Sequence, residues 1–318
     1  MEYLCNNCPR ICNIIRNKAG DGVCKMGADA VIARAAPHFD EEPVISGTRG
    51  SGAVFFSGCA LRCRFCQNYD ISHGGFGRPV SVEGLKHIYS NLIAQGVHNI
   101  NLVNPTHFVE PILASLEEGL SVPVVWNSGG YERVETIRRL GGRVRVFLPD
   151  LKYRFEDAAG RYSGAKDYFA HASAALREML RQTGPVRLND EGVIVSGVIA
   201  EMLRQTGPVV LDKDGLIQSG VIVRHLILPG RVEESKAVLD WIAAELPGAW
   251  VSLMAQYVPM GNVRGVDALE RRLTQDEYDA VVDHLFALGL EDGFVQELSS
   301  AEEKYIPAFD LTGVPEAD

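Results

Sequence analysis

The sequence predicts an α/β protein: a small cysteine-rich module over residues 1–46, followed by a partial (βα)6 TIM-like barrel over residues 47–318. Two observations predict this division. All seven cysteines lie within the first 66 residues, and after the glycine-rich stretch 47–52 short apolar runs alternate with helical patterns. Because strands that alternate with helices of this length form βα units, we expect the strands to pair in parallel.

Each expected element is either a short apolar run or a stretch with helical periodicity. The strands are expected over residues 53–57, 99–103, 122–126, 144–148, 221–228 and 250–257, with 293–298 as a candidate for one more. The helices are expected over residues 82–95, 108–118, 131–140, 166–181, 233–245 and 275–288. The first of these helices places Val82, Leu85, Ile88 and Leu92 on one face.

Composition excludes several classes of protein. A hydrophobic fraction of 46% with 23% charged residues is that of a globular chain and not of a disordered one. With 31 Lys and Arg against 41 Asp and Glu, the net charge of −10 disfavours a nucleic-acid partner. No apolar run reaches the ~18 residues of a membrane helix, so no membrane partner is expected.

The N-terminus lacks the basic region and apolar core of a signal peptide, which favours a cytoplasmic protein. In that reducing compartment, cysteines are expected to bind metal or to take part in catalysis, and not to form disulfides.

Three cysteines, Cys59, Cys63 and Cys66, form a C-x3-C-x2-C pattern. Three thiolates within eight residues can hold one 4Fe–4S cluster and leave one iron open for another ligand. A structural zinc ion needs four ligands, so the alternative is a zinc knuckle completed by a histidine such as His73. The pattern favours the iron–sulfur cluster.

The other four cysteines, Cys5, Cys8, Cys12 and Cys24, are spaced C-x2-C-x3-C-x11-C. Four thiolates could close a zinc site or hold a second Fe–S cluster, and spacing does not decide between them. Two alternatives remain: free cysteines packed as small hydrophobic residues, or thiols that act in the reaction itself.

Polar residues follow the expected strands, where functional groups gather in barrels of parallel strands. They form four groups: Asn104 to His107, Asn127 to Gly130, Asp150 to Lys152, and Gln256 with Tyr257. A surface ion pair, a helix cap or an ordinary helix residue would be the alternative interpretation of the first three groups.

For two charged stretches the sequence allows more than one position relative to the barrel. Arg224 and His225 are neighbours in one expected strand, so at most one of them faces the barrel interior. The stretch from His38 to Glu41-Glu42-Pro43 either covers the barrel mouth or forms a solvated loop.

The C-x3-C-x2-C stretch resembles the radical S-adenosylmethionine (SAM) superfamily. Nearly the whole chain resembles a subfamily similar to the activating enzyme of pyruvate formate-lyase, on the stretches CNNCPRIC, SGCALRCRFCQNYDIS, NSGGYE, LPDLKY, VRHLILPG and MAQYVPMG. The resemblance implies an oxidoreductase with a partial (βα)6 barrel and a 4Fe–4S cluster whose open iron is chelated by the amino and carboxylate groups of SAM. Reductive cleavage of SAM to a 5′-deoxyadenosyl radical, which abstracts a hydrogen atom, is the implied reaction.

The resemblance also implies residues that contact SAM: Gln67, Asn68, Asn127, Ser128, Asp150 and Lys152. Thr106 and His107 stand where many members carry Gly-Gly-Glu, and Gln256 and Tyr257 stand where the activase has a histidine. These four are expected as substitutes. No side-chain base is assigned, because the radical step requires none.

The expected electron donor is a flavodoxin- or ferredoxin-like protein. The substrate is either a backbone glycine of a glycyl radical enzyme, or a small molecule or peptide. A zinc-binding scaffold that uses both cysteine groups is the non-enzymatic alternative.

One internal repeat interrupts the pattern of strands and helices. Residues 178–199 recur as 201–222, with 16 of 22 positions identical, 23 residues further on. A single pair is too short for a solenoid, so a local tandem duplication is expected. In this interpretation the first copy continues a helix, the second leads into a strand, and one copy forms an insertion at the surface.

Overall fold

A computed structural model of the chain describes residues 3–17, 20–183, 186–188, 194–196, 210–211, 217–245, 249–290, 293–301 and 306–316. One sheet contains, in spatial order, β5 (Arg78–Val80), β3 (Ala30–His38), β4 (Ser51–Phe56), β6 (Ile100–Val103), β7 (Val124–Ser128) and β8 (Val146–Pro149). A second contains β10 (Ile194–Ser196), β9 (Val186–Leu188), β12 (Ile217–Leu226), β13 (Ala249–Met254) and β14 (Gly293–Val295), with β11 (Val210–Leu211) paired to β12.

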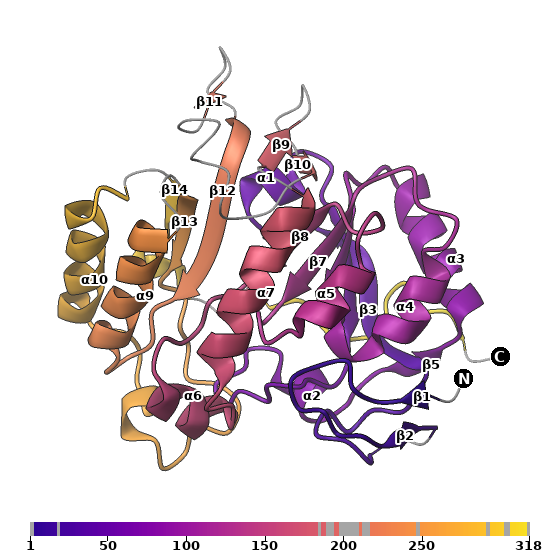
Figure 1. The fold of residues 1–318 in the computed structure, drawn as a ribbon, viewed down its shortest axis with the longest axis horizontal. Helices are drawn as coiled ribbons and strands as arrows, with labels where there is room; N and C mark the ends of the chain where they lie inside the picture. Colours follow the sequence, from indigo (N-terminus) through magenta and orange to yellow (C-terminus); the bar gives the residue numbers. More distant parts are fainter. Residues whose placement is uncertain are drawn as a thin grey trace.

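The strands that the sequence predicts pair in parallel, whereas β3 and β5 in the first sheet and β9, β10 and β11 in the second pair antiparallel. β4, β6, β7 and β8 pair in parallel, and so do β12, β13 and β14. A parallel bridge between Asp150 and Arg224 connects the two sets just beyond the end of β8. The fold is therefore mixed α/β, and the ends of these strands lie along one common edge (Figure 1).

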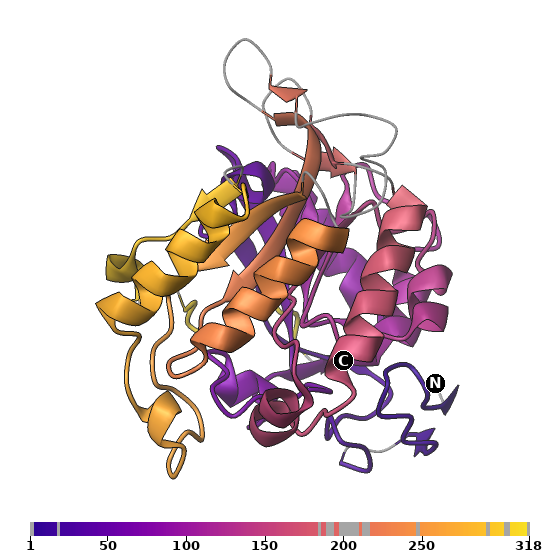
Figure 2. The same ribbon diagram turned by 60° about the vertical axis from the view of Figure 1, so that its left-hand side comes forward.

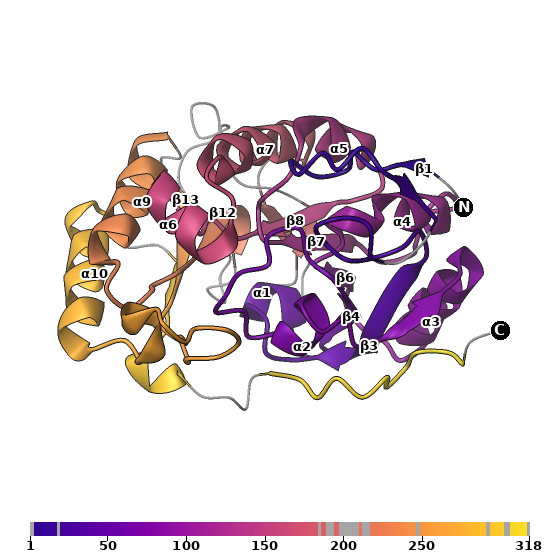
Figure 3. The same ribbon diagram turned by 90° about the horizontal axis from the view of Figure 1, so that it is seen from below.

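The helices are α1 (Pro43–Ser46), α2 (Tyr69–Ser72), α3 (Val82–Ala94), α4 (Val109–Ser115), α5 (Val134–Arg139), α6 (Glu156–Ser163), α7 (Tyr168–Thr183), α9 (Val232–Glu245) and α10 (Gln275–Ala287). Three short 3₁₀ helices accompany them: η1 (Thr106–Phe108), η2 (Asp267–Glu270) and η3 (Leu298–Ser300). The longer helices cover the outer side of a curved row of strands, whereas α1 and α2 lie on the inner side (Figures 2 and 3). No described helix combines the length and the apolar surface that crossing a bilayer requires.

Local sequence signals fix where the helices begin. The hydroxyl of Ser81 accepts a hydrogen bond from the backbone N–H of Gly84 and so caps α3. Thr274 and Glu277 form a reciprocal capping box at the start of α10. The apolar side chains Leu85, Ile88 and Leu92 of α3 are buried, as the helical periodicity predicts.

β3 is a strand that the sequence pattern does not predict. It lies within residues 1–46, yet it pairs antiparallel with β4, so this part of the cysteine-rich stretch belongs to the main sheet. The C-terminal segment 306–316 runs beside it, and Ala35 N–H donates to the carbonyl of Thr312 at 2.8 Å (Figure 3). Four alanines give β3 a weak strand signal, so its pairing partners decide its structure.

The duplicated segment lies partly outside the described residues. α7 extends through Thr183, which agrees with the expectation that the first copy continues a helix. Ser219 and Gly220, in the second copy, already belong to β12, where they pair with β9. Residues 197–209, where the first copy ends and the second begins, lie outside the described residues, and so does the expected surface insertion as far as it falls on them.

Candidate functional site

A cavity of about 530 Å³ lies on the inner side of the strands. Its wall contains the thiols of Cys59, Cys63 and Cys66 together with residues that follow the parallel strands. Of the predicted SAM-contacting residues, the following line the cavity: Gln67, Asn68, Asn127, Ser128, Asp150, Lys152 and Gln256. The structure therefore brings the three-cysteine group and most of the predicted contact residues together.

The three-cysteine loop leaves the end of β4 and returns at α2. Gly58 and Arg62 adopt left-handed backbone conformations, with φ of 79° and 54°, which curl the loop. Burial, together with the neighbouring thiol of Cys63, raises the pKa of Cys59 to about 12. Burial likewise raises the pKa of Cys66. These thiols would ionise at neutral pH only when a positive ion coordinates them.

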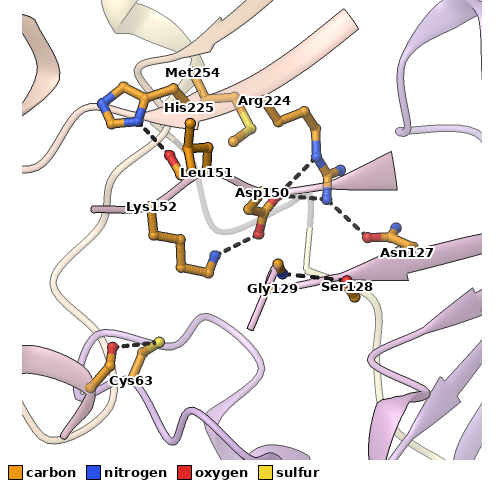
Figure 4. A network of polar contacts seen from close by, with 12 residues as sticks. Cys63, Asn127, Ser128, Gly129, Asp150, Leu151, Lys152, Arg224, His225 and Met254 are labelled. Carbon is orange, nitrogen blue, oxygen red and sulfur yellow. Dashed lines mark hydrogen bonds and ion pairs between the residues drawn. The ribbon is translucent and has the colours of Figure 1, made fainter. Parts of the chain in front are cut away.

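Cys63 has a second layer of support. The hydroxyl of Ser163, at the end of α6, lies 2.9 Å from the Cys63 sulfur and donates to it (Figure 4). The hydroxyl of Tyr153 lies 2.7 Å from the hydroxyl of Ser163. Both side chains are buried, so this chain of hydrogen bonds holds the sulfur in one orientation.

A network of charged side chains forms part of the cavity wall next to the cysteine loop (Figure 4). Asp150 accepts from Lys152 Nζ at 2.5 Å and from Arg224 Nε at 3.0 Å. Arg224 also donates to Asn127 Oδ1 at 2.9 Å and to Glu41 Oε2 at 3.1 Å. Asp150 and Lys152, whose side chains are 16% and 20% exposed, thus belong to a partly buried network and are not an isolated surface ion pair.

The network keeps Asp150, Lys152 and Arg224 charged. Burial alone would raise the pKa of Asp150, but Arg224 and Lys152 lower it below its ordinary value. Burial alone would lower the pKa of Lys152, but Asp150 and Cys63 raise it. For Arg224 the carboxylates likewise outweigh burial and raise the pKa.

The sequence analysis gave Arg224, Glu41 and Glu42 no assigned role in this site. The alternation along β12 is the signal that could have found Arg224, because His225 faces the opposite side, where it lies 2.8 Å from the carbonyl of Leu151. Nothing local indicates that Glu41, 183 residues earlier, meets Arg224.

Three predicted contact residues lie away from the cavity lining. Thr106 is buried and donates to Glu132 Oε1 at 2.6 Å. His107 is buried with its Nε2 2.7 Å from the carbonyl of Ser57, and burial lowers its pKa to about 3, so it is neutral. Tyr257 is buried and donates to the carbonyl of Leu269 at 2.7 Å. In this structure all three contact other parts of the protein.

Glu132 is a buried acid whose pKa burial raises to about 7, although Thr106 and Trp126 donate to it. The folded state therefore holds this proton more tightly than the unfolded state. Its stabilising contribution is complete below the ordinary value of 4.5 and is lost as the pH rises through about 7.

We accordingly expect Glu132→Gln to gain stability relative to wild type as the pH rises from about 5 to about 8, by up to about 3 kcal/mol. Urea unfolding of both proteins at the two pH values measures this difference, and the contributions of other titrating groups cancel. A difference that stays constant with pH would contradict the assignment.

The four N-terminal cysteines lie around the short pair β1 (Tyr3–Leu4) and β2 (Ile15–Arg16). Cys5, Cys8 and Cys24 are buried, and Cys12 is partly exposed. Burial raises the pKa of Cys8 to about 12, and the charges of the other three thiols add to this increase, which shows that the four are neighbours. Among the described residues no three His, Cys, Asp or Glu side chains form a preorganised site for a metal ion.

Arg10 fastens this cysteine-rich stretch to the three-cysteine loop. Its guanidinium donates to the carbonyls of Ala60 at 2.9 Å and Ser163 at 2.9 Å, and also to that of Gly164. Gly58, which immediately precedes Cys59, packs closely against Cys24: a Cβ added at Gly58 would lie only 2.8 Å from the carbonyl oxygen of Cys24. The two cysteine groups are therefore in direct backbone contact.

Gly58→Ala tests this contact. The new Cβ would lie 2.3 Å from Met26 Cγ and would impose a left-handed conformation on alanine. We expect a loss of roughly 2–4 kcal/mol in unfolding free energy, from left-handed strain plus overpacking.

Gly119→Ala is the matched control for Gly58→Ala. Gly119 has φ of +72° but no atom within 4 Å of the added Cβ, so only the strain of about 1 kcal/mol remains. Urea unfolding compares the two variants. Equal losses would show that Gly58 is not held between the two cysteine groups.

Comparison with known proteins finds a match to a family model over one segment of the chain. Residues 46–137 match the family model of a 4Fe-4S single cluster domain. The match contains Cys59, Cys63 and Cys66 and begins after the four N-terminal cysteines. It runs from α1 through most of α5, so it includes the part of the cavity wall that β4, β6 and β7 supply.

Two similarities extend over most of the chain. An uncharacterised protein of Methanocaldococcus jannaschii is 26% identical over 289 residues, which is 88% of this chain and 73% of that protein. The crystal structure of SuiB from Streptococcus suis bound to S-adenosylmethionine aligns with a TM-score of 0.45 at 14% identity and covers 76% of this chain. The alignment covers 49% of the SuiB chain, so this chain spans about half the length of that protein.

Proposed function

We propose that this protein is a radical SAM enzyme, with a 4Fe–4S cluster on Cys59, Cys63 and Cys66 and SAM bound in the adjoining cavity. One observation carries the proposal: the three thiols of the segment that matches a 4Fe-4S domain line the same cavity as the polar ends of four parallel strands. The pyruvate formate-lyase activase-like subfamily is the narrower form of the proposal, supported by the sequence motifs.

The residues present suit this cofactor. Three thiols are too few to close a structural zinc site but leave an open iron on a cubane cluster. The raised pKa values of Cys59 and Cys66 indicate that their ionisation depends on a coordinated cation. When bound, such a cluster together with SAM supplies a 5′-deoxyadenosyl radical for hydrogen-atom abstraction.

The chain itself binds and orients the ligand. Asn127 and Ser128, at the end of β7, offer an amide and a hydroxyl that suit paired ribose hydroxyls. Lys152 lines the same cavity as the three thiols and suits the carboxylate of a zwitterion. Because Asp150 and Arg224 hold these groups in place, the ligand meets a preorganised surface.

The remaining expectations complete the proposal. The curved row of parallel strands with helices outside supports a partial (βα)6 barrel (Figure 3). The four N-terminal cysteines would hold zinc or a second Fe–S cluster. A flavodoxin- or ferredoxin-like donor would supply the electron, and the substrate is either the glycine of a glycyl radical enzyme or a small molecule or peptide.

Anaerobic reconstitution with iron and sulfide, followed by dithionite and SAM, tests the proposal. We expect 5′-deoxyadenosine and about four irons per chain, or about eight if the N-terminal cysteines also hold a cluster. A colourless protein that retains zinc, binds no iron and forms no 5′-deoxyadenosine would overturn the proposal and favour a zinc-binding scaffold.

A further inference from the structure

The charges along the cavity are arranged in a fixed order. Lys152 interacts with the thiol of Cys63 on one side and with Asp150 on the other. Asp150 pairs with Arg224 (Figure 4). Arg224 in turn pairs with Glu41 and Glu42. The two glutamates, which line the same cavity, are thus separated from the cysteine loop by three intervening charged residues.

The carboxylates of Glu41 and Glu42 differ in how many hydrogen bonds they accept. Glu41 accepts from Asn101 at 3.3 Å, from Asn127 at 2.9 Å and from Arg224 at 3.1 Å. Among the described residues, the carboxylate of Glu42 has a longer contact, 3.7 Å from its Oε1 to Arg224 Nε, and an interaction with its own backbone N–H. Its side chain is 8% exposed, and among the described residues its Oε2 has no hydrogen-bond partner.

The charge of Glu42 is also incompletely balanced. Two cations, Arg224 and Lys152, face the carboxylates of Asp150, Glu41 and Glu42, so one negative charge is in excess when all are ionised. Burial raises the pKa of Glu42 to about 7, more than the attraction of Arg224 lowers it. A buried carboxylate of this kind is stabilised by an added cation that donates hydrogen bonds.

The rest of the cavity indicates what carries that cation. Its wall also contains apolar side chains: Phe55, Ile71, Val103, Leu226, Phe294 and Ile306. A second buried acceptor without a partner among the described residues, Oε1 of Gln296, belongs to the same lining. A ligand that suits these groups has an apolar body and a head group rich in N–H donors.

We propose that this end of the cavity is a substrate subsite that takes a primary ammonium group carried on an apolar chain, with Glu42 as its anionic partner. The inference rests on the proposed function, because it divides one cavity between SAM at the cysteine end and an amine substrate at the glutamate end. An ammonium group has three donors and no acceptor, which suits the Oε2 of Glu42, unpartnered among the described residues, and one excess negative charge.

The test is calorimetric titration of the full-length protein with n-hexylamine, and with n-hexanol as a neutral probe of the same length. We expect hexylamine to bind at least about tenfold more tightly than hexanol, and Glu42→Gln to lose about tenfold or more in hexylamine affinity. Glu132→Gln is the matched control: Glu132 is also buried, and its Oε2 also lacks a hydrogen-bond partner within the described part of the chain, but it does not belong to the cavity lining. Its hexylamine affinity should match wild type. Glu42→Asp, which withdraws the carboxylate by one methylene group, is the second variant in case Glu42→Gln does not fold, and it should also weaken hexylamine binding.

Several results would overturn the subsite: no hexylamine binding to wild type, equal affinities for hexylamine and hexanol, or unchanged affinity in Glu42→Gln. Competition between SAM and hexylamine in the reconstituted protein would also overturn it, because the amine would then occupy the position of SAM itself. Iron content and 5′-deoxyadenosine formation are measured without any amine. If the protein binds hexylamine but takes up no iron and forms no 5′-deoxyadenosine, only the proposed function is refuted. If the protein cleaves SAM but does not bind hexylamine, only the subsite is refuted.

Discussion

Replacing Cys63 with alanine is expected to abolish SAM cleavage and to leave any metal at the four N-terminal cysteines in place. The thiol of Cys63 is buried and accepts a hydrogen bond from Ser163, and alanine offers no sulfur in its place. Loss of one of three thiolates removes a ligand that the cluster needs. The measurements are 5′-deoxyadenosine formation and the iron and zinc contents after reconstitution.

Cys8→Ala is the matched control for Cys63→Ala. Both thiols are buried, but Cys8 belongs to the N-terminal group, so its loss should remove only the metal bound there. Persistent 5′-deoxyadenosine formation by Cys63→Ala would refute the cluster assignment. If Cys8→Ala also lost all SAM cleavage, the two groups would be coupled, and the hydrogen bonds from Arg10 to Ala60 and Ser163 supply a physical path for that coupling.

Replacing Arg224 with methionine is expected to be the most destabilising single change in the charge network. Methionine fills much of the same volume but leaves Asp150, Glu41 and Glu42 without their shared cation. Removing one partner from a buried ion network costs about 3–5 kcal/mol. Urea unfolding at neutral pH measures the loss.

Arg139→Met provides the comparison for Arg224→Met. Arg139 forms a two-point ion pair with Glu110 at 2.9 and 2.6 Å, but its side chain is 41% exposed. An exposed pair contributes about 0–1 kcal/mol. If the two variants lost similar amounts, the Arg224 network would behave as a solvated one, and the argument for an excess charge at Glu42 would fail with it.

Much of the fold could be predicted from local patterns. Burial of Leu85, Ile88 and Leu92 follows directly from their helical spacing in α3. The strands β6 and β13 lie within one to three residues of the predicted limits, because short apolar runs bounded by polar residues leave few alternatives. The strand β3 could not be predicted in this way, because its alanines pack well only once β4 and the C-terminal segment lie beside it.

The candidate site likewise contains residues that local patterns predict and residues that they do not. The cysteine spacing and the polar residues after the strands pointed to the residues that line the cavity, because parallel strands bring their ends to one edge. For Thr106 the strand-end argument is not sufficient. Asn104 adopts a left-handed conformation with φ of 59°, and the chain then enters η1, which directs Thr106 towards Glu132.

The sequence by itself determined the chemistry that this protein has available: two groups of cysteines, an order of strands and helices, and polar groups at successive strand ends. Only the tertiary structure decided which of these groups meet. Arg224 contacts Asp150 across 74 residues and Glu41 across 183, and Arg10 reaches Ser163 across 153. Contacts at such separations depend on how the sheets curve and on which side chains share a buried volume, and neither property is encoded in a local pattern.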